Sequence, residues 1–281
     1  GFLGSHVCDQ LSEAGHKVRV FDQVKSPWLR PNQEMIVGDL LDEKILEKAI
    51  AGCDVVYNFA GLSDLDEALE KPVETVKVNV LGNVMLLEAC RKAQVQRYIY
   101  ASTVYVYSRD GGFYRCSKQA AEHYVEEYQR TYGLDYTILR YGSLYGPRSS
   151  ENNGLWRIVK NAMDTNTVSY EGSPEAMREY IHVEDAARAS IAALGDDFLN
   201  QHVVLTGQET MRVKDLLKML SEILGISQDP RFIEAELHGH YIRTPYAYQP
   251  KLGRKYVPPI HVDLGQGLLQ LIDEVQKNTL K

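Results

Sequence analysis

The sequence predicts an α/β fold, a doubly wound parallel sheet with a smaller C-terminal lobe. Segments with the periodicity of strands and helices alternate along its first half, which is typical of a parallel sheet covered by helices on both faces. The composition changes near Tyr141, where Gly, Pro, Ser and Asn begin to cluster. With 281 residues, 44% of them hydrophobic, the chain is long enough for one such domain and an added lobe.

The first elements are a helix, a short turn and a strand. Apolar residues recur on one face of a helix over residues 4–14, and Gly15 provides its C-cap. The alternating run 17–21 predicts a strand that leads to Asp22. In chain order we then predict strands over residues 35–37, 54–60, 97–102 and 136–140, and helices over residues 43–51, 76–93, 114–131, 155–163, 184–194, 212–224 and 264–276.

The first four residues, Gly1, Phe2, Leu3 and Gly4, are typical of a dinucleotide site. Glycine-rich backbone at a helix N-terminus binds a pyrophosphate, and an acidic residue about 20 positions on accepts hydrogen bonds from the adenosine ribose. Asp22 fits that second role. The alternative is a tight turn followed by a helix cap. The motif usually begins with a strand and one more glycine, so we expect the sequence to lack about ten N-terminal residues.

The cofactor predicted from this unit is NAD. Asp22 would repel the 2′-phosphate of NADP, although Lys25 nearby leaves NADP open. We therefore predict an NAD-binding domain over residues 1–141. Residues 142–281 would mainly form a substrate-binding lobe over the carboxyl edge of the sheet, with some segments returning to the first domain.

Bulk properties exclude several classes of partner. The net charge of −7 argues against nucleic acid, and no apolar run is long enough to span a membrane. The pair His238 and His240 lacks further ligands for a metal. Scattered spacing predicts reduced thiols, and hence a cytoplasmic location, for Cys8, Cys53, Cys90 and Cys116.

The stretch 100–118 carries the candidate catalytic residues. Tyr114 and Lys118 are four residues apart at the start of a predicted helix, so both project from one face. An ammonium beside a phenol favours the phenolate, and the Thr103 hydroxyl would share its proton and hold a substrate oxygen. Such a group removes a proton from an alcohol as hydride leaves its carbon. The alternative is a surface helix pair.

Several motifs resemble one enzyme family: GDL at residues 38–40, NFAG at 58–61, VNVLGNVMLLEAC at 78–90, LRYGSLYGPR at 139–148 and REYIHVEDAARA at 178–189. With the YxxxK spacing, they resemble the extended short-chain dehydrogenase/reductase superfamily, in its NAD-dependent nucleotide-sugar epimerase/dehydratase family. The resemblance covers essentially the whole chain and implies a Rossmann-like fold.

The resemblance also implies residue roles. Thr103, Tyr114 and Lys118 would be catalytic. NAD would contact Gly1, Phe2, Leu3, Gly4, Asp22, Asp39, Leu40, Ala60, Gly61, Asn79, Tyr114, Lys118 and Tyr141. A nucleotide-diphosphate sugar would contact Thr103, Ser143, Arg178 and Arg243. Arg178 has the alternative of an ion pair with Glu179 or Asp185, and Arg243 that of a surface charge.

Departures from the family pattern narrow the implied reaction. Dehydratases and decarboxylases of the family carry a Glu two positions after the catalytic Thr or Ser, where this chain has Tyr105 after Val104. We therefore expect an epimerase that oxidises a sugar hydroxyl, at C4, and returns hydride to the opposite face. The short loop 108–113, and Ser143 in place of the family's Asn, leave the substrate open.

Two other functions remain as alternatives: a reductase or dehydrogenase of the same fold that consumes its nicotinamide, and a dinucleotide-binding regulator without catalysis. A homodimer is expected through the helices that begin at Val76 and Tyr114.

Overall fold

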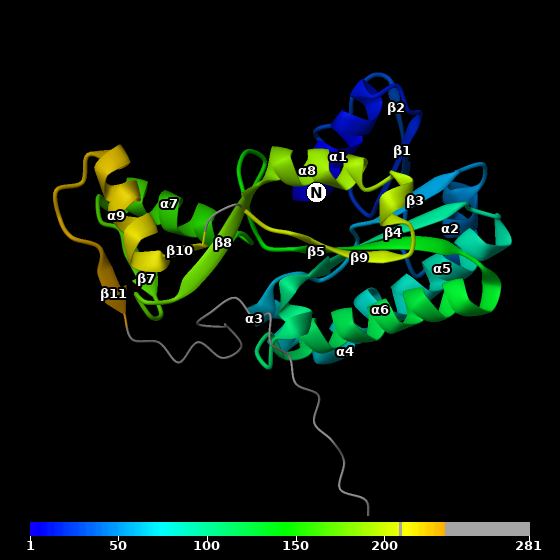
Figure 1. Cartoon of the computed structure of the whole chain (residues 1–281). Helices are drawn as coiled ribbons and strands as arrows, with labels where there is room; N and C mark the ends of the chain where they lie inside the picture. Colours follow the sequence, from blue (N-terminus) through cyan, green and yellow to red (C-terminus); the bar gives the residue numbers. More distant parts are fainter. Residues whose placement is uncertain (208–209, 234–281) are drawn as a thin grey trace, which may run out of the picture. The chain divides into compact units, whose positions relative to one another are not determined.

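Parallel strands alternate with helices along the computed structural model, which describes residues 1–207 and 210–233 (Figure 1). All of these residues belong to one compact unit, Gly1–Tyr248. Strand β1 (Val18–Asp22) pairs in parallel with β2 (Gln33–Val37). A second parallel sheet has the order β3-β4-β5-β9. Its strands are β3 (Val55–Asn58), β4 (Arg97–Thr103), β5 (Asp135–Tyr141) and β9 (Gln201–Leu205).

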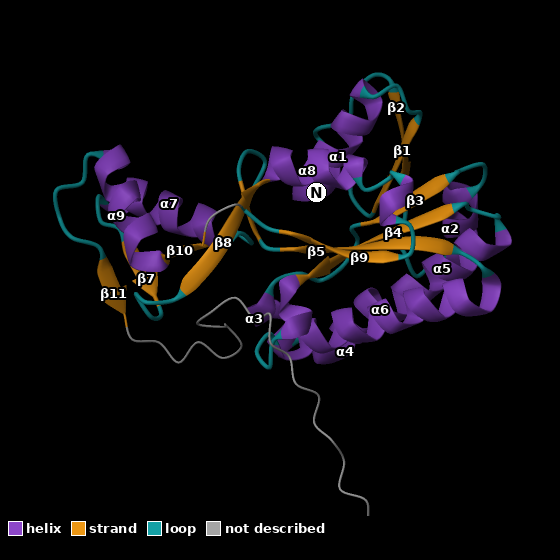
Figure 2. Ribbon diagram, viewed as in Figure 1, coloured by secondary structure: helices purple, strands orange, loops and turns teal. Residues whose placement is uncertain are grey.

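Helices cover both faces of the parallel sheet (Figure 2). On one face, α1 (Phe2–Glu13) packs against α8 (Val183–Ala192). The other face carries α2 (Glu43–Ile50), α5 (Asn83–Lys92) and α6 (Gly112–Tyr132). The predicted doubly wound α/β fold is therefore confirmed. No helix within the described ranges has both the length and the apolar character needed to cross a lipid bilayer.

The alternation of side chains along β4 divides the core in two. Tyr98, 0% exposed, points into a cluster that includes Leu87 of α5. Ile99, the next residue, belongs to the opposite cluster with Leu139 of β5 and Ala186 of α8. Each fully buried side chain of this size stabilises the fold by about 1.5–3 kcal/mol. Burial on both faces explains why β4 lacks the polar alternation of a half-exposed strand.

The helix predicted over residues 76–93 is interrupted. The chain forms α4 (Pro72–Val76), a π-helical segment over Lys77–Gly82, and then α5. Gly82 packs under Leu40, and an added Cβ there would lie 2.6 Å from the Leu40 Cδ2 atom. A π-helical turn often marks a functional segment, and this one carries the buried residue Asn79.

The chain after Tyr141 contains short strands that periodicity did not predict. Strand β8 (Met177–His182) pairs with β6 (Ser143–Tyr145) in parallel and with β10 (Thr210–Arg212) antiparallel. Strand β7 (Ser169–Glu171) pairs with β11 (Arg231–Ile233). The remaining elements are α3 (Leu65–Glu70), α7 (Gly154–Thr165), α9 (Val213–Leu224) and two 3₁₀ turns, Val104–Tyr107 and Asp196–Phe198. Four of these strands, β6, β7, β10 and β11, have three residues each and are too short for a periodic signal. The predicted helix over residues 264–276 lies outside the described residues.

Candidate functional site

Thr103, Tyr114 and Lys118 lie together where β4 ends and α6 begins. Thr103 is the last residue of β4. Gly111, with φ of 95°, turns the chain into α6, and an added Cβ there would lie 2.7 Å from the Tyr105 ring. Tyr114 and Lys118 then follow one helical turn apart on α6. The turn glycine therefore determines where the tyrosine and lysine lie relative to the end of the strand.

Lys118 is a buried cation and not half of a surface helix pair. Lys118 is 5% exposed. Its Nζ donates a hydrogen bond to the carbonyl oxygen of Ala101 at 2.8 Å and lies 4.9 Å from the centroid of the Tyr100 ring. Burial lowers the pKa of Lys118 to about 8, against the opposing influence of Glu122.

The phenol of Tyr114 is neutral at pH 7. Burial raises the pKa of Tyr114 and a hydrogen bond with Thr103 opposes this rise, so that the resulting pKa is about 12. Lys118 was expected to lower this pKa, but its Nζ lies 5.9 Å from the centroid of the Tyr114 ring and donates to Ala101 instead. Thr103 is therefore the side chain that favours the phenolate in this structure.

Behind these residues lies a buried ion pair that the sequence did not reveal. Glu122 of α6 accepts two hydrogen bonds from Arg140 of β5, at 3.0 Å from Nε and 2.6 Å from Nη2. Its Oε1 also accepts from the hydroxyl of Ser102 at 2.5 Å. Two features of the sequence could have indicated this ion pair. Glu122 lies four positions after Lys118, and Arg140 lies inside an otherwise apolar strand.

Asn79 holds the loop that contains Ala60 and Gly61. Its Oδ1 accepts from the backbone nitrogen of Leu62 at 2.7 Å, and its Nδ2 donates to the Leu62 carbonyl and to Ser117 Oγ, both at 2.9 Å. An added Cβ at Gly61 would lie 3.0 Å from Asn79 Oδ1 and 3.6 Å from Lys118 Nζ. Asn79 thus joins this loop to α6 beside the candidate catalytic residues, and its own amide is fully used.

The predicted dinucleotide residues gather at the N-terminus of α1 and the end of β1. The first turn of α1 begins at Phe2 and includes Gly4, and no side chain in the described part of the chain caps its backbone N–H groups. The carboxylate of Asp22 lies 3.7 Å from the Gly1 nitrogen. Asp39, in the adjacent turn, accepts from the Leu41 backbone at 2.8 Å. Uncapped N–H groups beside an exposed carboxylate suit a phosphate next to a ribose.

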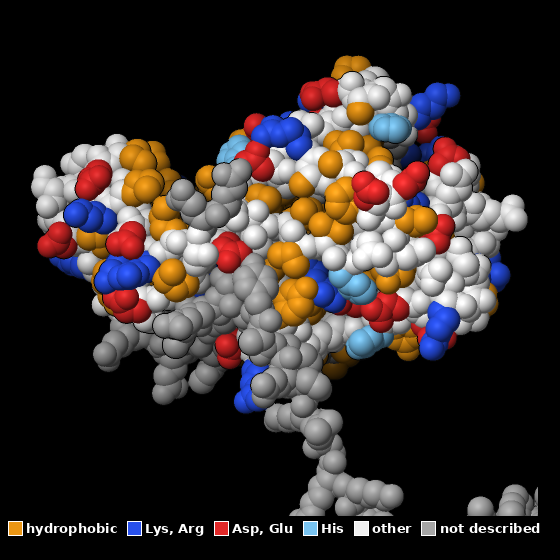
Figure 3. Space-filling view, viewed as in Figure 1, with side chains coloured by type: hydrophobic (Ala, Val, Ile, Leu, Met, Phe, Trp, Pro, Cys, Tyr) orange, Lys and Arg blue, Asp and Glu red, His pale blue; other side chains and the backbone are white. Residues whose placement is uncertain are grey.

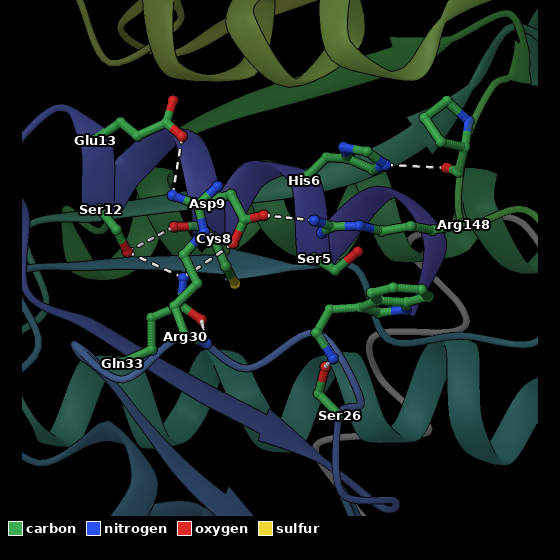
Figure 4. Close-up of polar contacts among 12 residues, drawn as sticks. Ser5, His6, Cys8, Asp9, Ser12, Glu13, Ser26, Arg30, Gln33 and Arg148 are labelled. Carbon is green, nitrogen blue, oxygen red and sulfur yellow. Dashed lines mark hydrogen bonds and ion pairs between the residues drawn. The ribbon is translucent and has the colours of Figure 1, made fainter.

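Buried polar contacts on the other side of α1 fix its position (Figure 4). Asp9, 5% exposed, pairs with Arg30 at 2.8 Å and Arg148 at 2.7 Å, and accepts from Gln33 at 3.3 Å. His6 Nε2 lies 3.0 Å from the carbonyl oxygen of Pro147. Desolvation would raise the pKa of Asp9, but hydrogen bonds from Arg148, Gln33 and Arg30 outweigh it and lower that pKa. A small cavity beside this cluster is lined by neither Tyr114 nor Lys118.

Two predicted cofactor residues are part of the core. Leu40 is 6% exposed and packs with the cluster around α5. Tyr141 is 5% exposed, and its hydroxyl lies 2.6 Å from Ser190 Oγ on α8. In this structure the Tyr141 hydroxyl therefore joins β5 to α8 through a hydrogen bond.

The predicted substrate residues are only partly described. Ser143 lies on β6 and Arg178 on the neighbouring strand β8, where Ser143 is opposite Tyr180. Arg178 is 7% exposed and donates to the Met177 carbonyl at 2.9 Å. Arg243, like His238 and His240, lies outside the described residues.

Other polar residues have structural roles. His182 caps α8 by accepting from the Glu184 backbone at 3.4 Å. The four thiols are all unpaired, and Cys116 is exposed. On the face drawn in Figure 3, acidic and basic side chains are interspersed, and neither sign forms a continuous patch there.

Comparisons with known proteins match this chain to one family and to solved enzymes. The model of the NAD dependent epimerase/dehydratase family matches residues 1–207. A UDP-glucose 4-epimerase of Thermotoga maritima, solved with UDP-glucose, is 26% identical with a TM-score of 0.80, covering 100% of this chain and 97% of that one. A UDP-glucose 4-epimerase of Thermus thermophilus, solved with NAD, is 27% identical with a TM-score of 0.78, covering 90% of this chain and 92% of that one.

A dehydratase is similar to the same degree. The dTDP-glucose 4,6-dehydratase of Streptomyces venezuelae, solved with NAD, is 26% identical with a TM-score of 0.79. The alignment covers 99% of this chain and 95% of that one. Overall similarity therefore does not separate the two reactions, and local chemistry has to do so.

Proposed function

The chain belongs to the NAD dependent epimerase/dehydratase family, and from this premise we propose that it is a nucleotide-sugar epimerase. The proposed reaction oxidises a sugar hydroxyl, at C4, to a transient ketone and returns hydride to the opposite face. The observation that carries this proposal is the cluster of Thr103, Tyr114 and Lys118, with Tyr105 in place of a carboxylate beside it.

The residues present fit NAD. Backbone N–H groups at Phe2 and Leu3 have no side-chain cap and would hold the pyrophosphate, and Asp22 would accept from the adenosine ribose. Gly61 lies close to Asn79 and Lys118, so a side chain at this position would crowd both residues. NAD would supply the acceptor for hydride from the sugar carbon and give the same hydride back.

The chain's own residues would move the proton. Tyr114 would take the proton of the sugar hydroxyl, while the hydroxyl of Thr103 hydrogen-bonds both the phenol and the sugar oxygen. Lys118, held as a buried cation by the Ala101 carbonyl, would stabilise the phenolate as it forms and donate to the nicotinamide ribose. On the return step Tyr114 would donate the proton back to the inverted oxygen.

Tyr105 favours epimerisation over water elimination. Its ring contacts that of Tyr114 edge-on, with centroids 6.4 Å apart. A phenol has an ordinary pKa near 10, so it is a poor acid for expelling a hydroxyl as water at neutral pH. A dehydratase needs a carboxyl group at that point, whereas an epimerase needs only that the ketone turn over before hydride returns.

Supporting features extend the proposal to the substrate and to assembly. Arg178 and Ser143 on neighbouring strands would contact the nucleotide-diphosphate sugar, and the guanidinium fork suits a diphosphate.

A homodimer would cover exposed apolar residues near α4 and α6, among them Val73, Val76 and Tyr124. Light scattering tests the dimer, and a monomer at working concentration would exclude it.

Incubation of the purified chain with UDP-, GDP-, CDP- and dTDP-hexoses tests the proposed reaction. We expect NMR to detect an inverted stereocentre in one sugar class, without net formation of NADH. Net NADH turnover would move the assignment to a dehydrogenase or reductase, and a 4-keto-6-deoxy product would move it to a dehydratase. NAD binding without any product would favour the non-catalytic regulator.

A further inference from the structure

The strongest feature not used so far is the buried ion pair behind the candidate catalytic residues. We propose that Glu122 is a positioning residue, which holds the helix carrying Tyr114 and Lys118 against the strand ending in Thr103 and keeps Lys118 charged. This inference rests on the proposed function, because a positioning role has meaning only if those three residues catalyse. It extends that function from three residues to the side chains that control them.

The geometry supports a positioning role because one carboxylate joins three elements. Glu122 belongs to α6, Arg140 to β5 and Ser102 to β4 (Figure 2). Three hydrogen bonds of 2.5, 2.6 and 3.0 Å converge on the two Glu122 oxygens. Ser102 directly precedes Thr103 in the sequence. The contact therefore fixes the middle of α6, one turn after Lys118, relative to the end of β4 that carries Thr103.

The network continues to the turn that follows Thr103. Arg140 Nη1 donates to the Tyr107 hydroxyl at 2.6 Å, and Tyr107 ends the 3₁₀ turn between β4 and the loop before α6. The side chain of Glu122 is 7% exposed, and that of Arg140 is 15% exposed. Water screens such a pair little, so its geometry is well defined.

Glu122 is also the anion that acts on Lys118. The two residues are one turn apart on α6, which places their side chains on the same face. The carboxylate raises the pKa of Lys118, against the larger effect of burial that lowers it. Because burial lowers the pKa of Lys118 to about 8, loss of the neighbouring negative charge would reduce the protonated fraction of Lys118 near neutral pH.

Other titratable groups face the same carboxylate from the packed elements. They are Tyr100 of β4, Tyr136 and Arg140 of β5, and His202 of β9. Burial raises the pKa of both tyrosines, so they are neutral, and burial lowers the pKa of His202. Arg140 carries the positive charge that balances Glu122. Substituting Glu122 by glutamine would therefore remove the anion that acts on both cations, Arg140 and Lys118.

The test is the pH dependence of turnover in Glu122→Gln, with whichever nucleotide sugar the wild-type chain inverts. In the proposed mechanism a protonated Lys118 stabilises the phenolate as it forms and donates to the nicotinamide ribose, so activity is expected to fall as pH rises through the Lys118 pKa. Removal of a nearby opposite charge shifts a pKa by about one unit or more. We expect the alkaline limb of kcat to move to lower pH by about that amount, with KM changed less than kcat.

A matched control separates electrostatics from general damage. Glu126→Gln makes the same change one turn further along α6, where the carboxylate pairs with His202 at 3.0 Å. Its alkaline limb should coincide with that of the wild type. Glu122→Asp retains the charge and should also retain the wild-type limb.

Loss of folding in the single variant would not end the test. Breaking a buried pair destabilises more than replacing both partners, so the double variant Glu122→Gln/Arg140→Gln should fold. It still lacks the anion beside Lys118, and its alkaline limb should move the same way. An active variant, single or double, whose limb stays at the wild-type position would overturn the inference. An inactive wild-type chain would instead overturn the proposed function.

Discussion

Replacing Thr103 by valine isolates the contribution of one hydroxyl to the acidity of Tyr114. Valine keeps the branched shape of the threonine side chain, and Thr103 is only 6% exposed, so the core stays filled. It removes the hydrogen bond that lowers the Tyr114 pKa, while burial continues to raise that pKa. The pKa of Tyr114 should therefore rise above its present value of about 12.

The magnitude follows from the kind of hydrogen bond that is lost. A hydrogen bond to a charged group such as the phenolate contributes about 1.5–3 kcal/mol. Since about 1.4 kcal/mol corresponds to a tenfold change, kcat should fall by about 10- to 100-fold. The backbone nitrogen of Tyr105 also loses its acceptor, Thr103 Oγ1 at 3.3 Å, which costs about 1 kcal/mol of unfolding free energy.

The assay compares kcat of Thr103→Val and Thr103→Ser for the sugar that the wild type inverts, with melting temperatures as a check on folding. Serine keeps the hydroxyl and serves as the matched control, so it should remain near the wild-type rate. A valine variant that is folded, binds NAD and turns over within about twofold of the serine variant would refute the role of Thr103, because the lost hydrogen bond predicts a larger change.

Three further predictions concern the scaffold and the cofactor. Asp9→Asn should reduce the unfolding free energy at pH 7 by about 3 kcal/mol in urea titrations. Because folding lowers the pKa of Asp9, this difference in unfolding free energy should shrink as pH falls below the unfolded pKa of about 3.9. The control is Glu13→Gln, which changes the exposed carboxylate paired with Arg30 and should have little effect on stability at either pH. Asn79→Ala loses three hydrogen bonds and should cost about 2 kcal/mol; an unchanged melting temperature would contradict its role in holding the loop. Asp22→Asn should weaken NAD binding in calorimetry by about tenfold or more, and equal affinity would contradict the ribose contact.

The sequence was sufficient for the features that depend on local patterns. Helix 114–131 was predicted and α6 spans Gly112–Tyr132, because an amphipathic run of this length between glycines leaves little choice. The parallel sheet followed from the alternation of elements. The family resemblance is confirmed, and with it NAD as the cofactor on which that family depends.

Features that depend on contacts distant in sequence were not predictable. Glu122 and Arg140 meet only because α6 packs across β4 and β5, and nothing local to either residue indicates the partner. The contact of Asn79 with the cofactor stays a prediction, whereas its hydrogen bonds to Leu62 and Ser117 could not be predicted, because only the fold brings those residues near it. The pKa shifts of Tyr114 and Lys118 could not be predicted either, because burial is the largest cause of both. Desolvation depends on tertiary packing, which a spacing such as YxxxK does not encode.

The most direct test of the central claim follows one hydrogen atom. The purified chain is incubated with the nucleotide sugar that it inverts, labelled with deuterium at C4, and the product is analysed by NMR and mass spectrometry. The epimerase account predicts the C4 epimer with the deuterium still on C4, because the same hydride leaves and returns within one active site. A product that has lost water, or one that has lost the deuterium from C4, would contradict it.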